Sequence, residues 1–176
     1  MTSTIIFSRQ IEKELEKIIS RFSHGNVFLL TEEIPDKVCI PLIRPLIEKT
    51  MIRKIVIPGG ETNKSIRSVE QVWEFLSKNG ADRKSLLINI GGGMLTDLGG
   101  FAASTFKRGM AFINIPTTLL AQVDASLGGK TGINFNGLKN EIGIFREPDA
   151  VLINTEFLKT IDRKNFLSGY AEMIKH

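Results

Sequence analysis

Short apolar runs alternate with longer amphipathic stretches along most of this chain. Six runs are predicted to be strands, because they are mostly apolar and too short to be buried helices; they span residues 4–8, 27–31, 54–57, 85–90, 111–115 and 150–153. Apolar residues at helical spacing predict helices over 9–22, 65–79 and 94–106. The repeated strand–helix order predicts an α/β fold, a Rossmann-like open parallel sheet with helices on both faces.

Breaker residues divide the rest of the chain. His24-Gly25-Asn26 is expected to end the first helix, and a short helix is expected to start at Pro41 and stop at Pro45. Another helix is expected to start after Pro116, with Thr117 or Thr118 as its N-cap.

The last third of the chain adds smaller elements. Asn136-Gly137 between two apolar runs predicts a small hairpin. Residues 155–159 suggest a short helix, and Asp162 is the expected N-cap of a final helix.

The predicted strand over 85–90 leads directly into Gly91-Gly92-Gly93 and then into a helix that carries Asp97. A helix start presents free backbone N–H groups and the positive end of the helix dipole, and glycines let a diphosphate approach the backbone. Asp97 could accept hydrogen bonds from an amide or a ribose. A plain tight turn between strand and helix is the alternative, since the spacing is not the GxGxxG of dinucleotide-binding folds.

Other polar groups follow the remaining strands or lie in nearby loops. In an open parallel sheet ligands bind beyond the carboxyl ends of the strands, so these groups are expected on one rim. Its lysines suit a phosphate or carboxylate, although each alone could be an ordinary surface charge. The candidates are Glu32, Glu33, Glu61, Lys64, Thr117, Thr118, Asp124, Lys130, Lys139 and Asn140. The run 128–132 resembles the end of a P-loop, but Asp124 stands where that motif requires glycine, which excludes it.

Composition narrows the class of protein. A length of 176 residues with 42% hydrophobic residues suggests one domain. The net charge of +4 is spread along the chain, which favours a small anionic ligand over nucleic acid. No segment resembles a signal peptide or reaches the roughly 18 apolar residues of a membrane span. The single cysteine, Cys39, excludes an intrachain disulfide and suggests a cytoplasmic protein.

The final helix carries Glu172, Lys175 and His176 within one turn. Glu172 and Lys175 could form an exposed ion pair. Glu172 and His176 could offer two metal ligands, but catalytic zinc generally takes three, and no third candidate is near in sequence.

Four consecutive blocks resemble the 3-dehydroquinate synthase family: GGGMLTDLGGFAASTFKRG, IPTTLLAQVDASLGGKTGIN, LKNEIGIFREPDAVLIN and GYAEMIKH. The resemblance extends from about Val27 to the end and covers that family's amino-terminal, NAD-binding half. The family continues into an all-helical domain that these 176 residues lack.

The resemblance implies a role for each matched residue. The implied NAD contacts are Glu61, Lys64, Gly91, Gly92, Gly93, Asp97, Thr117, Thr118 and Lys139, with Phe157–Thr160 (Phe157 and Thr160 at its ends) completing the pocket. Glu32 stands where the family usually has an aspartate, and its longer side chain can still reach a ribose. The implied substrate-binding residues are Asp124, Lys130, Asn140 and Lys175, with Lys130 and Lys175 also acting in catalysis. Arg108 would reach the substrate of a neighbouring subunit, which implies a homodimer, and Glu172 would be one ligand of a divalent zinc or cobalt ion.

The implied reaction is the second step of the shikimate pathway, in which a seven-carbon sugar phosphate loses phosphate and closes to a carbocycle while NAD is reduced and reoxidised. A related sugar-phosphate cyclase, a polyol dehydrogenase or a non-catalytic nucleotide-binding module are the alternatives. Because only one matched metal ligand is present, we expect these 176 residues to fold and bind NAD without completing catalysis.

Overall fold

A computed structural model describes residues 3–22 and 25–175. Its main sheet has six parallel strands in the order β1-β8-β5-β4-β2-β3. The strands are β1 (Thr4–Phe7), β2 (Val27–Glu32), β3 (Arg53–Ile57), β4 (Leu86–Gly91), β5 (Ala111–Pro116) and β8 (Ala150–Ile153). All six predicted strands are present, and the predicted Rossmann-like parallel sheet is confirmed.

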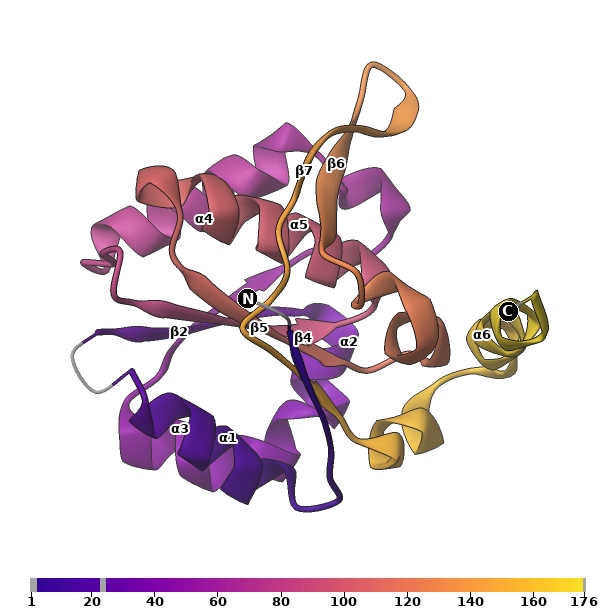
Figure 1. Cartoon of the computed structure of the whole chain (residues 1–176), viewed down its shortest axis with the longest axis horizontal. Helices are drawn as coiled ribbons and strands as arrows, with labels where there is room; N and C mark the ends of the chain where they lie inside the picture. The colour runs from indigo at the N-terminus through magenta and orange to yellow at the C-terminus, as the bar shows by residue number, and fades with distance from the viewer. Residues whose placement is uncertain (1–2, 23–24, 176) are drawn as a thin grey trace.

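Helices cover both faces of this sheet, as the sequence predicts (Figure 1). Helices α1 (Ile11–Ser20) and α3 (Arg44–Thr50) cover one face, and α4 (Ile66–Lys78) and α5 (Gly93–Thr105) cover the other. The central strand β4 is buried along its whole length and alternates between the two cores. Ile88 and Ile90 pack under α1 and α3, whereas Leu87 packs under α4 and α5. Burial on both faces explains why this strand reads as a continuous apolar run.

The prolines at 41 and 45 do not bound a single helix, which corrects that prediction. Helix α2 (Glu33–Val38) leads into the 3₁₀ helix η1 (Ile40–Ile43), and α3 then starts with Pro45 in its first turn. Proline at a helix start loses no hydrogen bond, because the first N–H groups have no acceptor inside the helix, so Pro45 begins a helix instead of ending one. The predicted stop of the first helix includes His24, which lies outside the described residues.

The predicted hairpin is confirmed and is longer than expected. Strands β6 (Lys130–Phe135) and β7 (Leu138–Phe145) pair antiparallel beside α5 and project beyond it, in orange in Figure 1. Ile133 is fully buried in the core under α4 and α5, which anchors the hairpin.

The segment after β5 begins as the helix that the sequence predicts and then widens. Thr118 is the N-cap, since its hydroxyl accepts a hydrogen bond from the Ala121 N–H at 3.3 Å. The backbone then forms the π-helix η4 (Ala121–Ala125). The Gln122 amide donates to the carbonyls of Pro116 and Asn154, each at 3.1 Å, and so fixes η4 to the ends of β5 and β8. Short π-helical turns of this kind are frequent at functional sites.

The chain ends in the 3₁₀ helix η5 (Thr155–Thr160) and in α6 (Arg163–Lys175), in yellow in Figure 1. Asp162 is the N-cap of α6, as predicted, because its carboxylate accepts the Asn165 N–H at 2.8 Å. Helix α6 packs against the segment that leads into η4, where Gly169 contacts Leu119 and Leu120. Its large apolar side chains are exposed: Phe166, Leu167, Tyr170, Met173 and Ile174. Within residues 3–22 and 25–175, no helix has the length and apolar character needed to cross a membrane.

Candidate functional site

The glycine turn between β4 and α5 lies at the carboxyl edge of the sheet, close to the segment after β5. Gly92 is the N-cap of α5, and no side chain of the described residues caps this helix. A Cβ on Gly93 would lie 2.8 Å from the Ala125 Cβ, and one on Gly92 would lie 3.3 Å from the Thr118 Cγ2. Glycine is therefore needed for this close approach, and the first N–H groups of a 13-residue helix stay available to an anion.

Glu32 ends β2, the strand next to β4, and lies beside this turn. Burial raises the pKa of its carboxyl group, and a hydrogen bond from the backbone N–H of Gly92 opposes that shift. The structure therefore places Glu32 next to the glycine turn. Its predicted contact with a ribose stays a prediction.

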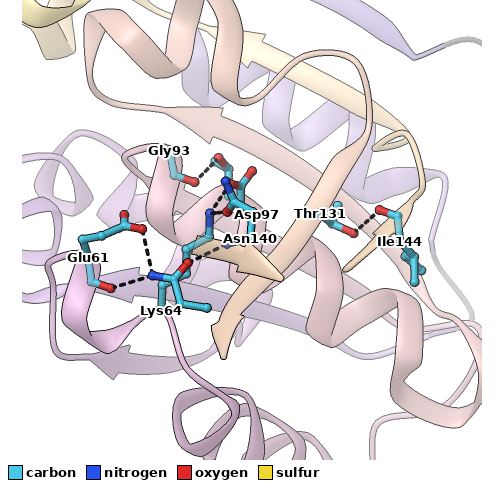
Figure 2. A network of polar contacts seen from close by, with 9 residues as sticks. Glu61, Lys64, Gly93, Asp97, Thr131, Asn140 and Ile144 are labelled. Carbon is cyan, nitrogen blue, oxygen red and sulfur yellow. Dashed lines mark hydrogen bonds and ion pairs between the residues drawn. The ribbon is translucent and has the colours of Figure 1, made fainter. Parts of the chain in front are cut away.

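Lys64 lies at the centre of a polar cluster between the glycine turn and the hairpin. Only 4% of its surface is exposed, and its Nζ lies 2.5 Å from the Asp97 Oδ2 and 2.5 Å from the Asn140 Oδ1. Figure 2 shows the three side chains pointing toward one another from three separate elements. Burial raises the pKa of Asp97, while the nearby Lys64 ammonium lowers it. The fold thus brings together two predicted cofactor contacts and one predicted substrate contact.

Asn134, which the sequence reasoning missed, connects this cluster to Glu61. Its side-chain amide donates to the Glu61 Oε1 at 2.9 Å, and its Oδ1 accepts the Asn140 N–H at 2.9 Å. Its own N–H donates to the Lys64 carbonyl at 2.8 Å. In the sequence Asn134 is one polar residue within a strand, so only its place after the block GGKTGI could have marked it.

A cavity of about 790 Å³ opens between η4 and the hairpin. Asp124, Lys130 and Asn140 line it together with Asp97. Three of the four predicted substrate-binding residues therefore share one cavity, which has the size of a small-molecule site. The fourth, Lys175, pairs with Glu172 at 2.9 Å on α6. The Glu172 carboxylate raises the pKa of Lys175, with a smaller contribution from Asp124 on η4.

Asp97 is the one predicted cofactor contact that lines this cavity, and three of the others lie elsewhere in the fold. Lys139 is exposed on β7 and does not line it. Phe157 is 1% exposed and packs in the core under α1 and α3, so the structure makes it a core residue. Thr160 lines a second cavity, of about 590 Å³, near the start of α1. The ligand contacts of all three stay predictions.

Arg108 is exposed in a left-handed turn that follows α5. Lys107, Arg108 and Gly109 have φ angles of 48°, 70° and 111°, which are unusual for the first two residues. Arg146, also missed from the sequence, supports this turn because its guanidinium donates to the Met110 carbonyl at 3.1 Å. The Arg146 N–H donates to the Gly129 carbonyl at 2.7 Å, directly before Lys130.

The described residues do not form a metal centre by themselves. They contain no group of three or more His, Cys, Asp or Glu side chains that could hold a metal ion. Glu172 could supply one carboxylate ligand to such a site. The possible second ligand, His176, lies outside the described residues.

The fold is shared with solved sugar-phosphate cyclases. The 2-epi-5-epi-valiolone synthase of Streptomyces hygroscopicus subsp. jinggangensis 5008, solved with NAD⁺ and Zn²⁺ bound, superposes with a TM-score of 0.88 at 25% identity, over 99% of this chain and 49% of that one. A 2-deoxy-scyllo-inosose synthase complexed with carbaglucose-6-phosphate, NAD⁺ and Co²⁺ gives 0.85 at 26% identity, over 97% of this chain and 47% of that one.

Sequence similarity identifies the family within this class. Residues 54–168 match the family described as 3-dehydroquinate synthase N-terminal, and the chain belongs to the 3-dehydroquinate synthase family. The 3-dehydroquinate synthase of Parabacteroides distasonis is 51% identical over 174 residues, which are 98% of this chain and 49% of that protein. The chain thus spans about half the length of the curated relatives it matches.

Proposed function

We propose that this chain is the NAD-binding half of a 3-dehydroquinate synthase. The observation that carries the proposal is the Gly91–Gly93 turn, where an uncapped helix start lies beside the buried Lys64–Asp97 pair and the 790 Å³ cavity. The similar cyclases whose structures contain NAD⁺ give independent support. The site fits the cofactor, because glycines leave room for a diphosphate at the helix start.

NAD, when bound, supplies reversible hydride transfer, and the residues of the chain place it. The N–H groups from Gly93 onward at the start of α5 receive the diphosphate, Glu32 accepts a ribose hydroxyl, and Thr117 and Thr118 close the pocket from the segment after β5. A carboxylate at position 32 also disfavours NADP, because it would repel the additional phosphate.

The proposed substrate is 3-deoxy-D-arabino-heptulosonate 7-phosphate, which is converted to 3-dehydroquinate and phosphate. It carries a carboxylate and a phosphate, and both anionic ends suit lysine ammonium groups. The place of Lys130 in the cavity lining supports its part in this proposal, and Lys175 is proposed from the family resemblance. Asn140 and Asp124 orient the hydroxyls between them.

We also propose that the 176 residues alone are catalytically incomplete. Glu172 is one ligand where a catalytic metal generally takes three, so no step is assigned to a metal here. We further infer a cytoplasmic homodimer in which the exposed Arg108 reaches the partner's substrate.

Calorimetric titration with NAD tests the proposed function. The unsubstituted chain should bind one NAD, and Gly92→Val should bind at least about tenfold more weakly, or roughly 1.4 kcal/mol, because its side chain fills the diphosphate position. Gly92→Ala, whose side chain is intermediate in size, should bind NAD with intermediate affinity. Equal melting temperatures of the two variants and the unsubstituted chain would show that the fold is retained. Unchanged affinity in Gly92→Val would contradict the assignment, as would phosphate release from the heptulosonate phosphate by the isolated chain at the rate of a full-length synthase.

A further inference from the structure

Asn134 stands between the two halves of the proposed site, and no role follows for it from the family resemblance above. It lies on β6, where the hairpin ladder is irregular. Between the pairs Ile133–Ile142 and Phe135–Leu138, this one residue of β6 faces three residues of β7. Such bulges redirect a side chain away from the regular ladder. Here the redirected side chain reaches Glu61 in η2 (Glu61–Asn63), on a different part of the fold.

On the cofactor side, Asn134 joins a short turn, which is closed by its own backbone hydrogen bonds, to the hairpin. Glu61 is exposed and begins η2, which is three residues long and follows Gly60 at a φ of 96°. The Asn134 amide donates to the Glu61 carboxylate at 2.9 Å and to its carbonyl at 3.3 Å. The backbone N–H of Asn134 holds the other end of the same turn through the Lys64 carbonyl. Three hydrogen bonds therefore fix both Glu61 and Lys64 relative to the hairpin.

On the substrate side, Asn134 stabilises an unusual backbone conformation. Asn140 has a φ of 54°, in the left-handed region that costs energy for most residues. The Asn134 Oδ1 accepts the Asn140 N–H at 2.9 Å and thus holds this conformation. The same conformation points the Asn140 Oδ1 at the Lys64 ammonium, while Asn140 also lines the 790 Å³ cavity.

We propose that Asn134 is a positioning residue that sets the cofactor contacts Glu61 and Lys64 relative to the substrate contact Asn140. This role rests on the proposed function, because it needs NAD and substrate to occupy the two sides. The amide is suited to it because one end donates to a carboxylate while the other accepts an N–H. An aspartate at the same position would retain the acceptor and place a second carboxylate against Glu61.

The test compares NAD binding by the unsubstituted chain, Asn134→Ala, Asn134→Asp and the control Asn136→Gly. The control removes an amide from the same hairpin at its tip, where a φ of 49° suits glycine. We expect Asn134→Ala to weaken NAD binding about tenfold, which corresponds to about 1.4 kcal/mol, and Asn136→Gly to bind as the unsubstituted chain does.

Asn134→Asp supplies a pH profile that a purely structural role would not produce. Two facing carboxylates repel each other, which favours protonation of one of them. The protonated group can then donate a hydrogen bond to the other and so restore the contact between position 134 and Glu61. The pH profile of this variant's NAD affinity, taken relative to that of the unsubstituted chain, should therefore be low at pH 8 and rise toward pH 5. The comparison cancels the titration of Glu32 and Asp97, which both chains share. Hydrogen exchange at the Asn140 amide should accelerate in Asn134→Ala and not in Asn136→Gly.

The outcomes separate this role from the proposed function. No NAD binding by the unsubstituted chain would overturn both. Normal binding together with unchanged affinity and unchanged Asn140 exchange in Asn134→Ala would overturn the role of Asn134 alone. A flat pH profile in Asn134→Asp would also count against it, because the Asn134–Glu61 contact would then not affect the cofactor.

Discussion

Two lysine–carboxylate pairs of this chain carry the same charges in different surroundings. Lys64 and Asp97 lie 2.5 Å apart with side-chain exposures of 4% and 19%, whereas Lys175 and Glu172 lie 2.9 Å apart with exposures of 71% and 21%. The first pair joins the loop after η2 to α5, and the second lies within a single turn of α6. Both lysines are candidate ligand contacts, but only the first also holds the fold together.

The difference shows how burial changes the value of one ion pair. Lys64 is desolvated by burial, so its ammonium depends on Asp97 and Asn140 for hydrogen bonds. Lys175 is still hydrated and can leave Glu172 at little cost, which suits its proposed role as a substrate contact. Lys64 is therefore held in place, whereas Lys175 is free to change its partner.

The largest expected effect comes from exchanging each lysine for methionine. Lys64→Met should destabilise the chain by about 3 kcal/mol, because it leaves the partly buried Asp97 carboxylate without its cation. Urea unfolding followed by circular dichroism measures the loss. Lys175→Met is the matched control, and its unfolding midpoint should move much less, since the Lys175 ammonium is 71% exposed and contributes little as a surface ion pair. Equal midpoints for the two variants would remove the distinction between the pairs.

A second, smaller effect concerns the only cysteine, which extends the contrast between buried and exposed groups. Burial raises the pKa of Cys39 from 9.0 to about 11, against a weaker opposing contribution from Thr160. At pH 8 the native thiol should react with a disulfide reagent at least about 100-fold more slowly than in urea, because two pKa units reduce the thiolate that much. The absorbance of the released thiol gives both rates. Comparable rates would show that this core opens readily.

The smallest effect is expected at Glu32, beside the glycine turn. Its raised pKa means that the folded chain binds this proton more tightly than the unfolded chain does. Burying the ionised carboxylate therefore destabilises the folded chain fully at a pH above the raised pKa. This destabilisation disappears below pH 4.5, the ordinary pKa, where the group is protonated in both states. Glu32→Gln should therefore raise the melting temperature at pH 7, by on the order of 2 °C, and leave it unchanged at pH 4. Scanning calorimetry at both pH values measures this.

The matched control for Glu32 is Glu48→Gln, at an exposed position of α3. It should show no difference between the two pH values. The same Glu32→Gln exchange is expected to weaken NAD binding, so stability and affinity should move in opposite directions. A loss of stability at pH 7 would show that the hydrogen bond from Gly92 outweighs the cost of burial.

The sequence predicts the sheet well, because each strand is a short apolar run between clear helix signals. It predicts the polar rim for a related reason: groups that follow parallel strands must meet at one edge. It is wrong at Pro41 and Pro45, where proline starts helical segments. Proline marks a helix boundary without saying on which side the helix lies.

The contacts that join distant elements could not be predicted. Lys64 donates a hydrogen bond to Asn140 because β7 departs from its regular pairing with β6. No local sequence pattern predicts such a bulge. Asn134 and Arg146 were missed for this reason, since each acts through partners far along the chain. The burial that separates Lys64 from Lys175 is likewise a property of the assembled fold.

The strand order has a consequence for how the chain is made. Strand β1 lies at one edge of the sheet, where its neighbour is β8, in a register that pairs Thr4 with Ala150. On the ribosome β1 emerges before β8, so it must wait for the strands in between before it can pair. Joining residues so far apart costs loop-closure entropy and slows folding. Strands β2, β3, β4 and β5 can pair as they emerge, so the sheet grows from its centre and β8 and β1 complete it together.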